Sequence, residues 1–205
     1  MWPNAEEMTQ LLERARNGDP SAVEALLARH REPLQHMVRS RLDPALHQRL
    51  DASDIVQDVM LEASQRLSDY LREPALPFHL WLRQMAHDHV IDAYRKHRKA
   101  QRRSLDREQS LAPAAWSDQS SIELAACLRD PELTPASAAM REELQRRLHE
   151  MMDRMDAEDR EILLMRHVEQ LSNQQIAGLL GLTEAAASMR YLRALKKLRV
   201  LLDSR

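Results

Sequence analysis

The sequence predicts an all-α protein of two helical domains joined by a linker. Its 205 residues include only three glycines, and 43% are hydrophobic and 30% charged, whereas sheet proteins use more turn glycines and β-branched residues. Apolar residues recur at helical spacing on both sides of a central stretch. That stretch is acidic and holds several prolines, which is typical of a linker. We therefore expect domains at residues 1–103 and 138–205, joined by residues 104–137.

The cysteine count and the hydropathy limit where the protein works. A single cysteine, Cys127, excludes an internal disulfide and suits a reducing compartment. No apolar run approaches the ~20 residues of a membrane-spanning helix, and residues 1–20 lack the apolar core of a signal peptide. We expect a cytoplasmic protein that does not insert into a membrane.

The first domain is expected to contain four amphipathic helices, because its apolar residues recur at helical spacing. Pro33 should interrupt the second of them. Asp51 can cap the third, and the fourth is either continuous or divided by a short loop near residues 87–89. The four helices span residues 8–16, 22–42, 51–71 and 78–103.

The second domain ends in the most informative segment of the chain, residues 171–199. Ser172 and Gln175 fit a capping box at the start of a short helix. Gly181 supplies a positive-φ turn, and Thr183 caps a second helix. That helix turns an apolar stripe inward and leaves cations outward, as in a helix-turn-helix DNA reader; a helical hairpin with a solvated basic face is the alternative. Earlier helices are expected over residues 138–155 and 156–168.

The formal net charge of −2 conflicts with DNA binding until the charges are placed along the chain. Residues 95–103 hold six Arg or Lys and no acid, and residues 190–199 hold five and no acid. Between them, residues 104–137 hold six Asp or Glu and only two Arg. Two basic patches separated by an acidic connection predict two separate contacts with nucleic acid.

Three segments together resemble a known family. Residues 51–63, DASDIVQDVMLEA, resemble region 2.2 of bacterial RNA polymerase sigma factors, and residues 78–95 resemble regions 2.3 and 2.4. Residues 155–199 resemble region 4. Regions 1.1 and 3 have no counterpart and a linker takes their place, so the layout is similar to that of the extracytoplasmic-function (group 4) sigma factors. The resemblance covers roughly residues 10–103 and 138–202.

The resemblance implies that the third helix docks on the clamp coiled coil of the largest subunit of core RNA polymerase. Its outward residues would form the contact, since a mixed polar and apolar face suits packing on a partner's helices. The alternative is the solvated polar face of an ordinary amphipathic helix. The expected docking residues are Asp54, Gln57, Asp58 and Leu61.

The resemblance also implies that the fourth helix captures the non-template strand of the −10 promoter element. Opening a duplex costs about 1.4 kcal/mol per step, so phosphate contacts must compensate. The family places a base-reading loop at His87, Asp88 and His89, and Asp88 departs from the Asn that many members have there. Phe78 and Trp81 have rings that stack on bases, but their spacing fits a core better. The expected phosphate contacts are Arg83, Arg95, Lys96, Arg98 and Lys99.

Region 4 of the family places its second helix in the major groove of the −35 element. The face here is poor in polar readers, because Ala186 and Ser188 stand where the family often has Thr and a Lys or Arg. Arg190 is open to a base contact, a phosphate contact or a structural ion pair, and Lys197 to phosphate or the polymerase flap. The expected −35 contacts are Ala185, Ala186, Ser188, Met189, Arg190, Leu192, Arg193 and Lys197.

The predicted function is that of a sigma factor, which binds core RNA polymerase, recognises the −10 and −35 elements of promoter DNA and promotes melting and initiation. No catalytic residue, cofactor or metal is expected. One alternative is a helix-turn-helix regulator that acts without sigma activity. A second is a helical metalloenzyme that uses His87, Asp88, His89 and Asp92, although side chains at i and i+2 of a helix diverge. Control falls to an anti-sigma factor, to expression level, or to the linker and N-terminal segment.

Overall fold

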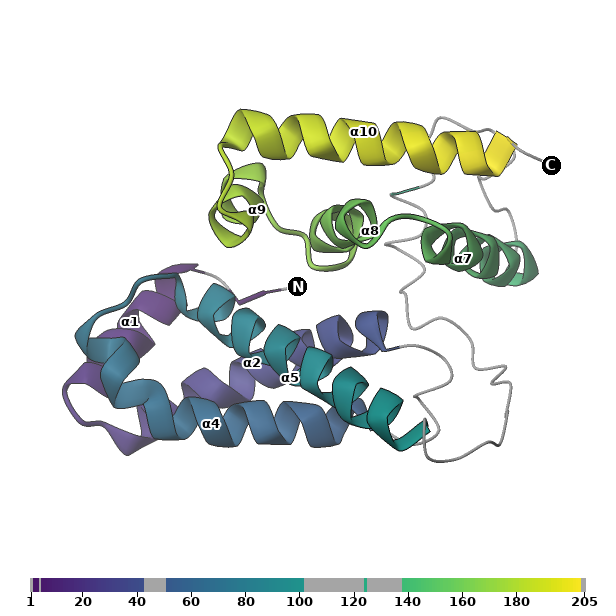
Figure 1. The fold of residues 1–205 in the computed structure, drawn as a ribbon. Coiled ribbons are helices and arrows are strands. Elements are labelled where there is room, and N and C mark those ends of the chain that lie inside the picture. Colours follow the sequence, from purple (N-terminus) through teal and green to yellow (C-terminus); the bar gives the residue numbers. More distant parts are fainter. Residues whose placement is uncertain (1, 4, 43–50, 102–123, 125–137, 204–205) are drawn as a thin grey trace. The chain divides into compact units, whose positions relative to one another are not determined.

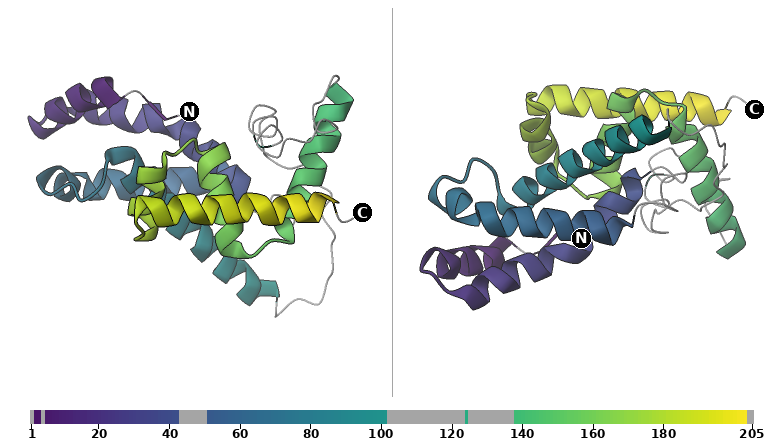
Figure 2. Two further views of the ribbon diagram at one scale, coloured as in Figure 1. Left: turned by 90° about the horizontal axis from the view of Figure 1, so that it is seen from above. Right: turned by 60° about the horizontal axis from the view of Figure 1, so that its bottom comes forward.

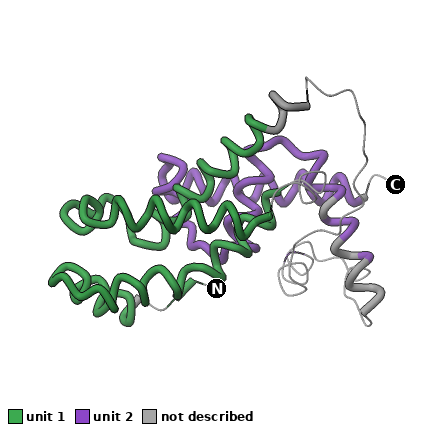
Figure 3. The backbone as a smooth tube through the Cα atoms, turned by 90° about the horizontal axis from the view of Figure 1, so that it is seen from below, with its two compact units in different colours: residues 1–112 green, residues 113–205 purple. Residues whose placement is uncertain are grey.

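Every regular element in the part of the chain that the computed structural model describes is a helix (Figure 1). The described part comprises residues 2–3, 5–42, 51–101, 124 and 138–203. The chain divides into two compact units, residues 1–112 and residues 113–205 (Figure 3). The all-α prediction is confirmed. The expected boundaries at residues 103 and 137 fall outside the described residues and stay predictions.

In its described residues, unit 1 contains four helices that share one apolar core. They are α1 (Ala5–Arg16), α2 (Pro20–Arg41), α4 (Ala52–Arg72) and α5 (Phe78–Gln101). The cap predicted for α4 is present, since the Asp51 carboxylate accepts a hydrogen bond of 2.8 Å from the Ser53 backbone N–H. Helix α2 continues through Pro33, contrary to prediction. Leu34 and Met37 after the proline are buried like Leu26 before it, so packing holds both halves in one helix.

Helix α5 is continuous through residues 87–89, where a loop was one of the two expectations. Ala86 and Val90, on either side of that segment, are both buried one turn apart. No glycine or proline occurs in the segment to stop the helix. The base-reading loop implied by the resemblance is therefore absent from the described structure, and the three residues lie on a helix.

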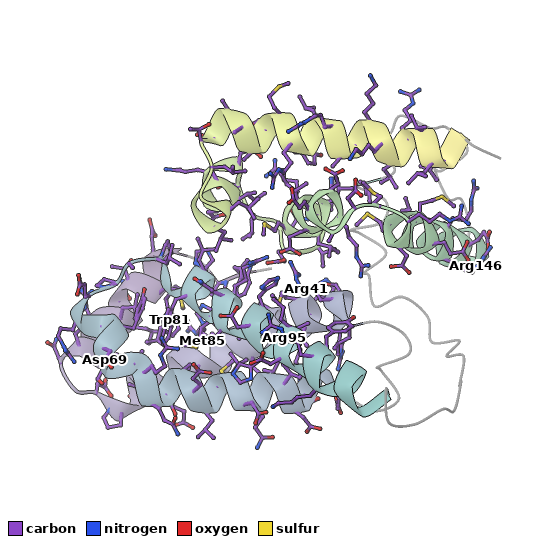
Figure 4. All side chains as sticks on the ribbon, viewed as in Figure 1. Arg41, Asp69, Trp81, Met85, Arg95 and Arg146 are labelled. Atoms are coloured by element: carbon purple, nitrogen blue, oxygen red, sulfur yellow. The ribbon has the colours of Figure 1, made fainter. Side chains whose placement is uncertain are left out.

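The aromatic residues of α5 belong to the core of unit 1. Phe78 is 3% exposed. The Trp81 ring stacks on Tyr70 with ring centroids 4.6 Å apart, and the Tyr70 hydroxyl donates to the Leu76 carbonyl at 2.9 Å. Figure 4 shows Trp81 and Met85 pointing into the space between the helices of unit 1. The core assignment that the spacing favoured is confirmed over base stacking.

Unit 2 ends in the predicted helix-turn-helix. The capping box is complete: the Gln175 N–H donates to the Ser172 hydroxyl at 3.2 Å, and the Ser172 N–H donates to the Gln175 side chain at 2.8 Å. Gly181 adopts φ 64°, where a side chain would be strained. The unit contains α7 (Ala138–Asp153), α8 (Ala157–Leu163), the π-helical turn η2 (Leu164–Val168), α9 (Asn173–Leu180) and α10 (Glu184–Asp203).

Helix α10 is the long element of unit 2, and α7, α8 and α9 all pack on it. Figure 2 shows it as one straight helix with α9 beside its N-terminal end. Ala187, Ala194 and Leu198 are buried along its inner side, at 0–1% exposure, so the predicted inward stripe is confirmed. Of the helices that the structure describes, none is long and apolar enough to cross a membrane.

Candidate polymerase and nucleic-acid interfaces

The outward face of α4 carries the four residues expected to bind polymerase. Asp54, Gln57, Asp58 and Leu61 recur at three- and four-residue intervals and are all exposed. On the opposite side of the helix, Val56, Val59 and Ala63 are fully buried. Leu61 is 59% exposed and lies one helical turn from the exposed acid Asp58. The face therefore offers an apolar centre with a polar rim.

Helix α5 exposes only part of the set expected at the −10 element. Arg95 and Lys96 are exposed, and the Arg95 guanidinium lies 3.5 Å from the Asp92 carboxylate. Asp88 is exposed and His87 is half-buried. The side chains of Arg98 and Lys99 lie outside the described residues.

Arg83 departs from its prediction. Its side chain is 4% exposed, between the buried Leu82 and Met85, so the structure does not support a phosphate contact. The register of α5 explains the difference, because residues three and four apart share the inward face.

His89 is held by a neighbouring helix. Its Nε2 lies 2.8 Å from a Glu62 carboxylate oxygen, and Arg66 donates to the other oxygen of Glu62 at 2.7 Å. The hydrogen bonds from His89 and Arg66 lower the pKa of Glu62. His89 thus joins α5 to α4, and the structure does not support a base contact for it. No three metal-ligating side chains converge anywhere in the described part of the molecule.

One flank of α10 faces α8, and two cations on this flank form ion pairs with carboxylates at the start of α8. The Arg190 guanidinium lies 3.3 Å from the Glu158 carboxylate. The Lys197 ammonium lies 2.9 Å from the Asp156 carboxylate and also contacts that of Asp159. The hydrogen bonds from Asp159 and Asp156 raise the pKa of Lys197. Of the three roles open to Arg190, the structural ion pair is the one that the structure contains.

The other flank of α10 extends from the side beside α9 to the solvent-facing side and is mainly apolar near the N-terminal end of the helix. Ala185, Met189 and Leu192 are exposed, the last two at 58% and 56%. Ser188 is the polar residue among them, and the Asn173 side-chain amide donates to its hydroxyl oxygen at 2.9 Å. Arg193 is exposed between the two flanks, whereas Ala186 is half-buried. The eight expected −35 contacts are therefore divided between two surfaces of one helix.

Sequence reasoning missed the residues that hold these flanks in place. Asn173 lies 15 positions from Ser188, and the carboxylates of α8 lie 32 to 41 positions from their cations on α10. The sequence carries one signal of these partners, the acidic first turn of α8, but acids there ordinarily stabilise the helix N-terminus and do not point to a partner on another helix.

Comparison with known proteins finds two family models in order along the chain. Sigma-70 region 2 matches residues 26–100, and sigma-70 region 4 matches residues 145–198. Among curated relatives, the sigma factor CnrH of Cupriavidus metallidurans is 30% identical over 203 residues, 98% of this chain and 97% of CnrH. The probable sigma factor RfaY of Xanthomonas campestris is 36% identical over 143 residues, 70% of this chain but only about a third (32%) of RfaY.

Solved structures show the same fold. CnrH in complex with the cytosolic domain of CnrY superposes with a TM-score of 0.59 at 25% identity, covering 95% of this chain and 96% of CnrH. The sigma factor RpoE of Bartonella quintana, solved with the anti-sigma factor NepR, gives a TM-score of 0.53 at 17% identity. That alignment covers 93% of this chain and 98% of RpoE.

Proposed function

The chain belongs to the sigma-70 family of RNA polymerase sigma factors, and from this premise we propose that it is of the extracytoplasmic-function group and how its described surfaces divide the work of initiation. It is an RNA polymerase sigma factor that acts in promoter recognition and initiation. We assign the outer face of α4 to the polymerase, the exposed part of α5 to the −10 element and α10 to the −35 element. The ordered pair of family matches, region 2 and then region 4, carries this proposal.

The polymerase surface is centred on Leu61. An exposed leucine with carboxylates and an amide around it has the composition of a docking face, where an apolar centre gives affinity and a polar rim excludes wrong partners. We propose that it packs on the clamp coiled coil of the largest subunit. No other large apolar side chain of the described part of unit 1 is exposed.

The −10 surface is proposed to consist of Arg95, Lys96, Asp88 and His87. The two cations suit the phosphates of a separated strand. The exposed Asp88 carboxylate accepts hydrogen bonds and repels phosphate. It therefore suits the amino group of a base on the separated strand. Arg83 and His89 are left out of this surface because α5 directs them to the core and to α4.

Reconstitution tests the proposed function. The full chain is mixed with core polymerase, and transcription start sites are mapped genome-wide with and without the chain. We expect a new set of starts that share two upstream elements. We also expect Leu61→Asp to lose co-purification with core polymerase, whereas Leu192→Asp, a matched exposed leucine in unit 2, retains it. A chain that never associates with core polymerase would refute the proposal.

The alternative of an independent helix-turn-helix regulator makes a different prediction. Such a protein binds its operator by itself, whereas the sigma factor proposed here shares its DNA affinity with the polymerase. A mobility-shift assay on mapped promoters therefore separates the two. We expect a shift with the holoenzyme and little or none with the chain alone.

Control by an anti-sigma factor is also proposed. CnrH was solved with the cytosolic domain of CnrY and RpoE with the anti-sigma factor NepR, and this chain shares their fold. An anti-sigma factor that covers Leu61 would exclude core polymerase from the same surface. We place this exchange in the cytoplasm, where the polymerase works, and we assign no catalytic step to the chain itself. Competition between the partner and core polymerase for labelled chain is the direct test.

A further inference from the structure

The base-reading end of α10 exposes apolar side chains where DNA-binding helices usually present polar ones. Four large apolar side chains are exposed among the described residues, and three of them lie on α10: Met189, Leu192 and Val200. Met189 and Leu192 share the N-terminal half of the helix with exposed Ala185, at intervals of three and four residues. Ala185, Met189 and Leu192 form one continuous strip, called here the apolar strip.

Exposed apolar groups on a DNA-reading helix have one natural counterpart in the major groove. Thymine alone among the four bases carries a methyl group there, and apolar side chains contact it. The other groove features are hydrogen-bond donors and acceptors, which alanine, methionine and leucine side chains do not satisfy. We propose that this chain recognises its −35 element through thymine 5-methyl groups that contact Ala185, Met189 and Leu192. The inference rests on the proposed role of α10 at that element.

The charges beside the strip favour DNA as its occupant. Arg193 and Lys196 are exposed next to it on the same helix, in reach of phosphates that flank a groove. The acidic side chains of α8 lie on the other flank, where they pair with Arg190 and Lys197. The strip itself therefore faces the anionic duplex without a carboxylate among its members.

Ser188, the polar residue beside the strip, is consistent with thymine as the target. Ser188 accepts a hydrogen bond from Asn173, so its own hydroxyl hydrogen is available for an acceptor. Thymine O4 and the N7 atom of either purine are acceptors in the major groove, whereas the cytosine amino group is a donor. A donating serine is therefore compatible with thymine and disfavours cytosine, while the preference for thymine comes from its apolar neighbours.

Replacement of thymine by deoxyuridine tests the proposal directly, because it removes the methyl group and keeps every hydrogen-bonding group. Holoenzyme containing the full chain is bound to a mapped promoter whose −35 thymines are replaced one at a time on both strands. We expect two or more positions to weaken binding, by roughly fourfold each, the factor expected for one buried CH₂ group.

Variants then connect the methyl groups to the strip. Met189→Ala and Leu192→Ala should each abolish the deoxyuridine effect at one position and leave the others intact. Val200→Ala is the matched control, since Val200 is equally exposed at 60% and lies about 12 Å beyond Leu192 along the same helix. It should keep the full deoxyuridine pattern. All three changes truncate exposed side chains, and circular dichroism verifies the helical content.

The outcomes separate this inference from the function on which it rests. Protection of the −35 region with no loss of affinity at any deoxyuridine overturns the inference alone, as does a −35 element without thymine on either strand. Deoxyuridine effects that persist in both variants, with loss of core-polymerase association, would assign the strip to a protein partner and overturn it as well. No upstream protection on any mapped promoter overturns both proposals.

Discussion

The two flanks of α10 differ in what their side chains are engaged with. Toward α8, Arg190 and Lys197 are held by three carboxylates of the same unit. On the other flank, near the N-terminal end of the helix, Met189 and Leu192 are exposed and Ser188 is held by Asn173 of α9. Two of the five cations of α10 are thus engaged with carboxylates of unit 2, whereas Arg193 and Lys196 stay exposed beside the apolar residues. The paired cations and the apolar residues lie on different sides of one helix, so each set can be changed without the other.

The largest expected effect comes from a change that displaces both flanks together. Ala194 is fully buried on the inner side of α10. Ala194→Leu should therefore destabilise unit 2 by about 1–3 kcal/mol through overpacking. Thermal melting followed by circular dichroism measures it. Ala185→Leu, the same change on the exposed side, should alter stability by less than about 0.5 kcal/mol. Equal destabilisation by the two variants would contradict the inner and outer assignment.

Replacement of Asp159, which contacts Lys197, should weaken only the contact between α8 and α10. The Asp159 side chain is 12% exposed and contacts Lys197, so Asp159→Asn leaves a weakened partner in a partly buried site. We expect the melting temperature of unit 2 to fall by roughly 5 °C. Deoxyuridine sensitivity at the −35 element should persist, since it belongs to the other flank. Loss of that sensitivity would mean that the flanks are coupled.

Removal of an exposed acid should change DNA affinity in the opposite direction. Glu158 pairs with Arg190 while its side chain is 76% exposed, so Glu158→Gln releases a cation at little cost in stability. We expect holoenzyme to bind promoter DNA several-fold more tightly at low salt. The slope of log K against log salt should steepen by about 0.9 for one added phosphate contact.

Glu143→Gln is the matched control for that experiment. Glu143 is also an exposed acid in an ion pair, 2.7 Å from Arg146, but it lies on α7 rather than beside the base-reading end of α10. It removes the same charge and should leave the salt slope unchanged. An identical gain in both variants would indicate a general effect of net charge and not the release of Arg190.

The Asn173 side chain that holds Ser188 can be replaced by one of the same size. Asn173→Asp replaces a donor by an acceptor, so the Ser188 hydroxyl would donate to it instead of to a base. We expect an additional few-fold loss in affinity at the base pair that Ser188 contacts, on top of a uniform loss from the added negative charge. Measurements over promoter variants at each −35 position locate that pair. Asn173→Ala adds no charge, so it should weaken the base preference at that same position without a uniform loss of affinity.

Alkaline pH should give the smallest effect and act on one flank. The pKa of Lys197 is raised by its carboxylate partners, so the ion pair stabilises the fold below the unfolded pKa of 10.5. That stabilisation is lost as the pH rises through the higher folded value. The difference in melting temperature between the wild type and Lys197→Met should therefore shrink between pH 9 and pH 12. A constant difference would contradict the pairing.

The sequence predicted those features that depend on residues close together in the chain. The capping box of Ser172 and Gln175 and the left-handed Gly181 were both found as expected, because each depends on backbone groups within a few residues. The two-part family layout was recoverable for the same reason, since each motif is contiguous. The inward stripe of α10 followed from helical spacing alone.

Tertiary structure decided which polar side chains face outward. Arg83 is buried, His89 is bonded to Glu62 27 positions away, and Arg190 pairs with an acid on α8. Periodicity assigns a residue to one side of a helix, but it does not say which neighbouring helix lies beside that side or what charge it carries. Partners distant in sequence meet only when the helices pack. For that reason the chain by itself determined the type and order of its parts, and packing determined which residues remain for the polymerase and the DNA.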